Sequence, residues 1–83
     1  MTKMNYDFEP VHIRSKKISG GRRSLYLDIV SDGVRSREFL KLYLLPEDGK
    51  GAKPANSAVM RMAEEMKAKR TLEVMRDGLQ IED

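Results

Sequence analysis

Residues 24–44 carry the pattern that most constrains the fold of this chain: two alternating runs of side chains joined by a short turn. The first run, SLYLDIV, covers residues 24–30, and the second, VRSREFLKLYL, covers residues 34–44. Between them lies Ser31-Asp32-Gly33, and Asp-Gly between alternating runs is a strong signal for a β-hairpin. The sequence therefore predicts two antiparallel strands connected by a tight turn.

A third strand is expected upstream of this hairpin, because residues 11–17, VHIRSKK, also alternate. The glycines at positions 20 and 21 favour a turn before the hairpin, since glycine adopts positive φ without a steric cost. Three strands joined by tight turns form an antiparallel meander. Residues 46–54 contain two prolines and two glycines and are expected to form a loop.

A single helix is expected after this loop. Asn56 is a favourable N-cap residue, strong helix formers follow it to about Arg76, and Gly78 is a plausible stop. Apolar residues at positions i, i+3, i+4 and i+7 predict one face that covers the sheet. That face consists of Val59, Met62, Ala63 and Met66.

The predicted fold class is α+β, a three-stranded antiparallel β-sheet packed on one C-terminal α-helix. We expect residues 1–10 to form a flexible N-terminal arm and residues 11–76 to form the folded domain. The apolar residues after Met66 do not continue the helix stripe cleanly. Residues 77–83 are therefore expected to be a tail that leads to a following domain.

Composition excludes several classes of function. A chain of 83 residues forms one small domain, and the absence of cysteine excludes disulfides and thiolate metal sites. The single histidine, His12, cannot build a metal site alone, and no nucleophile with a matching base is visible, so we expect no catalysis, metal or cofactor. No segment resembles a membrane span or a signal peptide, so a cytoplasmic location is expected.

The two faces of the predicted sheet differ in chemistry. Leucine and isoleucine lie on one side, and basic and aromatic residues lie on the other, because side chains alternate along a strand. Residues 12–41 hold eight Lys and Arg against three carboxylates, a net charge of +5. The face predicted to be left open by the helix carries His12, Arg14, Lys16, Tyr26, Asp28, Arg35, Arg37, Phe39, Lys41 and Tyr43.

A basic face with interleaved aromatics indicates binding of nucleic acid, because arginine and lysine bind phosphates and guanine edges. A β-ribbon also fits the major groove of duplex DNA. Arg14, Arg35, Arg37 and Lys41 are expected to be the main contacts. Phosphate anchors are expected at Lys16 and at residues beside the first turn. The basic residues predicted to bind DNA are Arg14, Lys16, Lys17, Arg22, Arg23, Arg35, Arg37 and Lys41.

Three other interpretations stay open. The basic face can be an ordinary solvated surface, with Tyr26 and Phe39 in a cross-strand contact. Exposed aromatics can also stack unpaired RNA bases. The chain can instead be a protein-interaction module that docks a partner through Leu72, Met75, Leu79 and Ile81.

A bulge near Phe39 would turn this side chain inward and change the register of Arg35 and Arg37.

Two segments of the chain resemble a known family. SLYLDIVSDGVRSREFLKLYLLPE covers residues 24–47, and NSAVMRMAEEMKAKRTLEV covers residues 56–74. Together they resemble the N-terminal arm-type DNA-binding domain of phage-integrase-like tyrosine recombinases. The form found in integrases of Bacteroides-type conjugative transposons is the most similar.

This resemblance implies a three-stranded sheet on one helix, with the sheet inserted into the major groove of arm-type sites during DNA integration and recombination. The DNA-facing residues of the family fall by position on Arg14, Lys16, Tyr26, Arg35, Arg37 and Lys41. The expected partners are double-stranded DNA and the remaining recombinase domains of a full-length chain. The catalytic tyrosine of such enzymes belongs to another domain.

Overall fold

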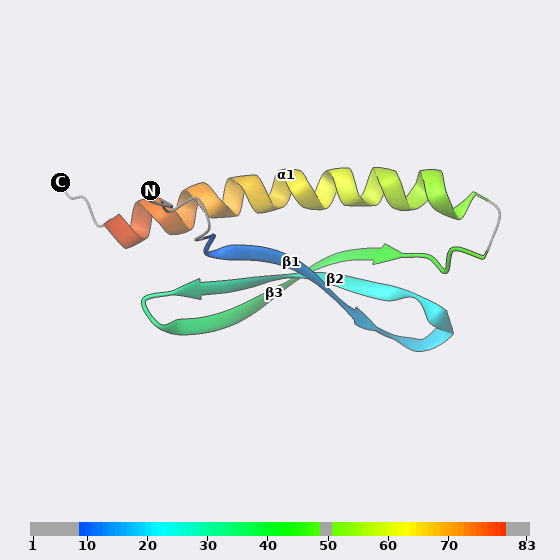
Figure 1. The fold of residues 1–83 in the computed structure, drawn as a ribbon, viewed down its shortest axis with the longest axis horizontal. Helices are drawn as coiled ribbons and strands as arrows, with labels where there is room; N and C mark the ends of the chain where they lie inside the picture. The colour runs from blue at the N-terminus through cyan, green and yellow to red at the C-terminus, as the bar shows by residue number, and fades with distance from the viewer. Residues whose placement is uncertain (1–8, 49–50, 80–83) are drawn as a thin grey trace, which may run out of the picture.

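Three strands and one long helix follow each other in the order that the sequence predicts. The computed structural model describes residues 9–48 and 51–79, so most of the predicted arm and the last residues of the predicted tail lie outside it. The elements are β1 (Val11–Lys17), the 3-10 turn η2 (Ser19–Gly21), β2 (Arg23–Ser31), β3 (Val34–Leu44) and α1 (Ala52–Leu79). The helix lies along one face of the sheet and leaves the other uncovered (Figure 1). The α+β prediction is confirmed.

The hairpin between β2 and β3 turns at two residues. Asp32 and Gly33 have φ values of 55° and 77°, as a type I′ turn requires, and this turn matches the right-handed twist of the strands. The register Val30↔Arg35 follows directly from this turn. The predicted hairpin is therefore confirmed, and its turn fixes which side chains share a face.

The sheet has the order β1-β2-β3, with both pairs antiparallel. The β2–β3 ladder is regular up to Tyr26↔Phe39 and resumes at Ser24↔Tyr43, so β3 carries two extra residues between these pairs. Lys41 lies within this bulge and has a φ of 62°, a left-handed value that is uncommon for residues other than glycine. Because the offset is even, Phe39 and Tyr43 stay on the same face. The bulge does not turn Phe39 inward.

The apolar core lies between the sheet and α1. Val11, Leu27, Ile29 and Val74 form its buried cluster, and Ile13 and Leu40 pack against it. A helix of 28 residues is about 42 Å long at 1.5 Å per residue, close to the length of an 11-residue strand such as β3. The helix can therefore cover the sheet along its whole length.

The face that α1 buries differs from the predicted one. Met62 and Met66 are 50% and 41% exposed, so their assignment to the sheet-facing side is wrong, whereas Ala63 is completely buried. The buried side includes Ala52, Asn56, Ala63 and Val74. A sheet-facing row with a small residue at its centre allows close approach of the helix. The local i, i+4 pattern of methionines did not reveal this row.

The start and end of α1 also correct the prediction. The helix begins at Ala52, so Asn56 lies inside it and is not the N-cap, and it continues through Gly78 to Leu79. Pro54 fits the first helical turn because the amide hydrogens there have no partner within the helix. The Asn56 side chain accepts a hydrogen bond from the Leu45 amide (2.8 Å) and donates one to its carbonyl (3.0 Å). It thus joins the helix to the chain just beyond β3.

Replacing Asn56 with alanine should lower the free energy of unfolding by about 1–3 kcal/mol, because both polar backbone groups of Leu45 would lose their partner. Urea denaturation measures this change. Asn56→Ala should be compared with Ser57→Ala, whose side chain is exposed and which should change stability by less than about 0.5 kcal/mol. Equal effects of the two substitutions would show that the Asn56–Leu45 bonds do not anchor the helix.

Candidate nucleic-acid interface

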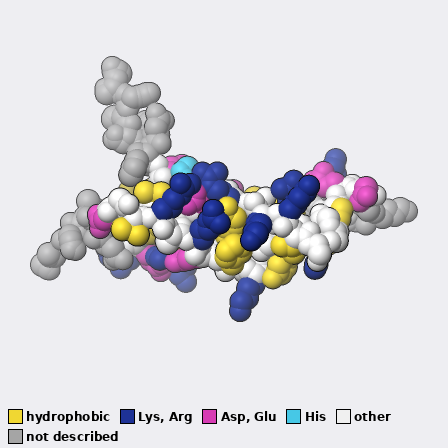
Figure 2. All heavy atoms as spheres, turned by 90° about the horizontal axis from the view of Figure 1, so that it is seen from below, with side chains coloured by type: hydrophobic (Ala, Val, Ile, Leu, Met, Phe, Trp, Pro, Cys, Tyr) yellow, Lys and Arg dark blue, Asp and Glu magenta, His cyan; other side chains and the backbone are white. Residues whose placement is uncertain are grey.

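The uncovered face of the sheet is rich in exposed basic side chains. Figure 2, which views the molecule from this side, shows Lys and Arg side chains gathered over the strands with hydrophobic side chains between them. The strand pairs Arg14↔Tyr26 and Asp28↔Arg37 lie on this face. The exposed basic residues that the strand register and the Tyr43 contact place here are Arg14, Lys16, Arg22, Arg35 and Arg37, and Lys41 is exposed in the adjacent bulge of β3.

Asp28 lies at the centre of this open face and is only 3% exposed. It accepts a hydrogen bond from Arg14 Nε at 2.6 Å, from the strand on one side. From the strand on the other side, Arg35 donates through Nε (3.1 Å) and Nη2 (2.9 Å). Three strands are therefore joined across the face by one carboxylate and two guanidinium groups.

The two arginines keep Asp28 ionised. Hydrogen bonds from Arg35 and then Arg14 hold the pKa of the Asp28 carboxyl well below its usual range, although burial acts in the opposite direction. The same contact raises the pKa of Arg35. At neutral pH the cluster of Arg14, Asp28 and Arg35 therefore carries a net charge of +1.

An aromatic pair supports the neighbouring part of the face. The rings of Tyr26 and Phe39 lie 4.9 Å apart between centroids, which confirms the predicted cross-strand contact. Arg37 lies over the Tyr26 ring, with 5.1 Å from Cζ to the centroid. Tyr26 is 7% exposed and Phe39 is 49% exposed. The structure thus places Tyr26 beneath Arg37, where its ring supports the guanidinium group.

Arg37 differs from its neighbours in having no carboxylate partner among the described residues. It is exposed and lies over the Tyr26 ring, and none of its guanidinium donors is used by another residue of the described ranges. Arg22 shows a similar arrangement over the Tyr43 ring, at 5.7 Å. Both arginines are thus oriented by aromatic faces and keep their full charge.

Two of the predicted DNA-binding residues lie elsewhere. Arg23 pairs with Lys17 in the β1–β2 ladder, and this register places both on the side of the sheet that faces α1. Arg23 also donates a hydrogen bond to the Ser15 hydroxyl on that side (3.3 Å). The structure therefore does not bring Lys17 and Arg23 together with the basic residues of the open face.

The carboxylate of β3 lies on the side of the sheet that faces α1, because the register pairs Glu38 with the core residue Leu27. Arg70 of α1 donates to both oxygens of Glu38, at 2.9 and 3.1 Å from Nε and 2.8 Å from Nη2. This pairing lowers the pKa of Glu38 and raises that of Arg70. Arg70 also pairs with Glu73 at 3.1 Å. The ion pairs fix α1 to β3 and leave Asp28 as the only strand carboxylate on the open face.

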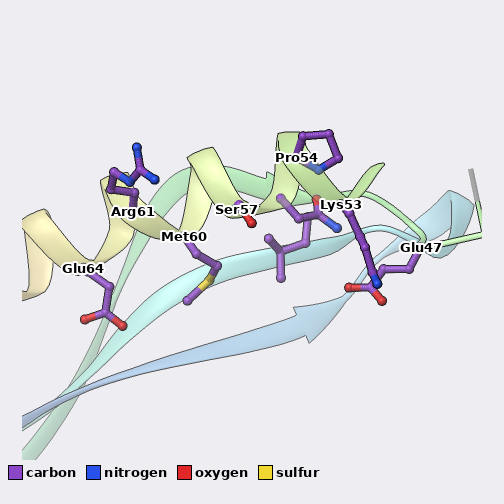
Figure 3. A pocket seen from close by; sticks show the side chains of 9 residues that line it. Glu47, Lys53, Pro54, Ser57, Met60, Arg61 and Glu64 are labelled. Atoms are coloured by element: carbon purple, nitrogen blue, oxygen red, sulfur yellow. The ribbon is translucent and has the colours of Figure 1, made fainter. Parts of the chain in front are cut away.

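A groove of about 730 Å³ lies between the first turns of α1 and the end of β3 (Figure 3). Its lining mixes Glu47, Lys53 and Glu64 with apolar side chains, and Arg61 points away from the sheet. Within the described ranges, no group of three or more His, Cys, Asp or Glu side chains could hold a metal ion. The groove thus presents no constellation that indicates a particular ligand or reaction.

Sequence reasoning did not recognise Asp28 as the centre of an ion cluster. The signal was present in the register, because Arg14 and Arg35 lie diagonally opposite Asp28 on the flanking strands. Diagonal neighbours are within reach of long side chains. Assigning residues to a face identified the members of this cluster but not the contacts between them.

Within the described part of the chain, helix α1 lacks the long apolar stretch that a helix needs to cross a membrane.

Comparison with known proteins gives one match. A family model described as an arm DNA-binding domain matches residues 11–81, which covers all three strands and the helix. No curated protein and no solved structure matches the chain significantly. The family match agrees with a sheet that presents basic side chains on an uncovered face. The chain belongs to the arm DNA-binding domains, which are non-catalytic DNA-binding domains of integrases.

Proposed function

We propose that this chain binds duplex DNA sequence-specifically at arm-type sites, as the N-terminal domain of a tyrosine recombinase, with its open sheet face in the major groove. The observation that carries the proposal is the set of five exposed basic side chains on the face that α1 leaves uncovered, with exposed Lys41 in the adjacent bulge. Residues 24–47 and 56–74 resemble integrases of Bacteroides-type conjugative transposons, which supports a role in a mobile element of that kind.

The chemistry of the face suits both parts of DNA recognition. Exposed Lys16, Arg22 and Lys41 can neutralise phosphates at the rim, and such contacts position a protein without reading sequence. Arg14, Arg35 and Arg37 lie nearer the centre of the sheet and are oriented by Asp28 or by Tyr26. Oriented guanidinium groups are suited to bidentate contacts with guanine.

The protein-interaction alternative rests on exposed apolar residues of the helix. Leu72 and Met75 are 66% and 51% exposed, whereas the side chains of Leu79 and Ile81 lie outside the described residues. Leu72 and Met75 are neighbours at i and i+3 of α1, but two apolar side chains make only a small patch, and small exposed apolar areas are common on protein surfaces. The RNA alternative rests on exposed aromatic rings that can stack unpaired bases. Phe39 and Tyr43 are 49% and 42% exposed, so both rings are accessible for such stacking.

DNA affinity should fall steeply with salt. If about four to six phosphates are neutralised, the slope of log K against log salt concentration should be roughly −4 to −5, because each contact releases condensed counterions. Fluorescence anisotropy with a labelled duplex measures the slope when the salt concentration is varied from about 50 to about 200 mM. Tighter binding to single-stranded RNA than to the duplex would favour the RNA alternative. Absence of DNA binding at low salt would contradict the proposal.

Arg37→Ala should weaken binding to the preferred duplex by about 1–3 kcal/mol and relax the preference at one base pair, if Arg37 contacts a base. Arg22→Ala is the matched control, since it removes another arginine held over an aromatic ring. Its effect should be similar on preferred and random duplexes, as expected for a phosphate contact. Equal losses on both duplexes for Arg37→Ala would remove the base-reading role of Arg37.

A further inference from the structure

Asp28 brings a negative charge to a surface that otherwise favours phosphate. Repulsion between this carboxylate and the DNA backbone lowers affinity for every sequence. The Asp28 carboxylate is also enclosed: its side chain is 4% exposed, and both of its oxygens accept hydrogen bonds from arginines. A carboxylate can accept a hydrogen bond from the cytosine amino group, but Asp28 is too enclosed for that role. Its effect on a ligand must therefore pass through Arg14 and Arg35.

The contacts of Asp28 leave specific donors of each arginine free. Arginine has five N–H donors in a planar fork. Arg14 uses Nε toward Asp28, so both of its terminal nitrogens remain available, and its side chain is 49% exposed. Arg35 uses Nε and Nη2, which leaves mainly Nη1, and its side chain is 66% exposed. Of the two, only Arg14 keeps a complete pair of terminal nitrogens for a bidentate contact.

We propose that Asp28 is a positioning residue that fixes Arg14 so that its two terminal nitrogens contact O6 and N7 of a guanine, with Arg35 held beside it. This inference rests on the proposed function, because it requires the open face to lie in the major groove. Arginine distinguishes guanine from the other bases through this bidentate contact in the major groove. A guanidinium group fixed before binding also loses less conformational entropy when the contact forms.

The proposal predicts opposite changes for specific and non-specific binding when Asp28 loses its charge. Asp28→Asn removes one of the two acceptor oxygens and the negative charge that hold Arg14 and Arg35, and it raises the net charge of the face by one unit. Binding to random DNA should become tighter, because phosphate contacts depend on charge and not on orientation. Binding to the preferred site should become weaker relative to random DNA. A purely electrostatic role of Asp28 would strengthen both kinds of binding alike.

The experiment uses the full chain and a duplex selected by the wild-type protein from a randomised pool, with a scrambled duplex for comparison. For Asp28→Asn, the ratio of the two affinities should fall by about 5- to 160-fold, which corresponds to the 1–3 kcal/mol of one bidentate base contact. Asp32→Asn is the matched control. It removes the same charge in the β2–β3 turn, at an exposed residue that tolerates asparagine. It should leave the ratio unchanged.

A second variant, Arg14→Lys, tests the inference in case Asp28→Asn impairs folding. Arg14→Lys preserves the charge at an exposed position but cannot bind Asp28 and a guanine together, so selection with this variant should lose the preference for guanine at one position. An unchanged ratio for Asp28→Asn, or an unchanged base preference for Arg14→Lys, would overturn the inference and leave the proposed function standing. If the wild-type chain selects no sequence at all, the proposed function and this inference both fail.

Discussion

Burial of the central strand on both faces is the constraint on which the rest of the domain depends. Six consecutive residues of β2, from Ser24 to Ile29, are buried. The side that carries Leu25 and Leu27 is buried under α1 in the apolar core. No helix covers the opposite side, so Asp28 and Tyr26 are buried there by side chains from β1 and β3. The uncovered face is therefore open to a ligand at its surface but packed beneath it.

The side chains of Asp28 and Tyr26, which are buried beneath the open face, explain how a small domain can hold a basic surface in one conformation. Arg14 and Arg35 reach toward each other from the two outer strands, and the carboxylate of Asp28 on the central strand between them offsets the repulsion of their like charges. The quadrupole of the Tyr26 ring stabilises Arg37 in a similar way. Each guanidinium group near the centre of the face is thus held by a partner that the strand register supplies. The same partners reduce the freedom of these groups before DNA binds.

Much of the fold could be predicted from the sequence, because alternation and Asp-Gly turn chemistry are local signals. The ranges of β1 and β3 and the separation of the two faces followed from them. The helix was less predictable, since its sheet-facing row is set by Ala63 and by the Asn56–Leu45 bonds, which are tertiary contacts. The basic members of the candidate site were visible as a pattern. Their pairing with Asp28 depends on diagonal distances across the sheet, which composition and periodicity do not give.

An amide NMR titration with a short duplex at low salt shows which surface of the domain binds DNA. If the open sheet face binds, chemical shifts should change at residues 12–16, 22–28 and 35–41, and these changes should reverse as salt is added. The outward side of α1, which includes Met62 and Met66, should change little. Changes confined to α1, or no changes at low salt, would contradict the assignment of the open sheet face as the surface that binds DNA.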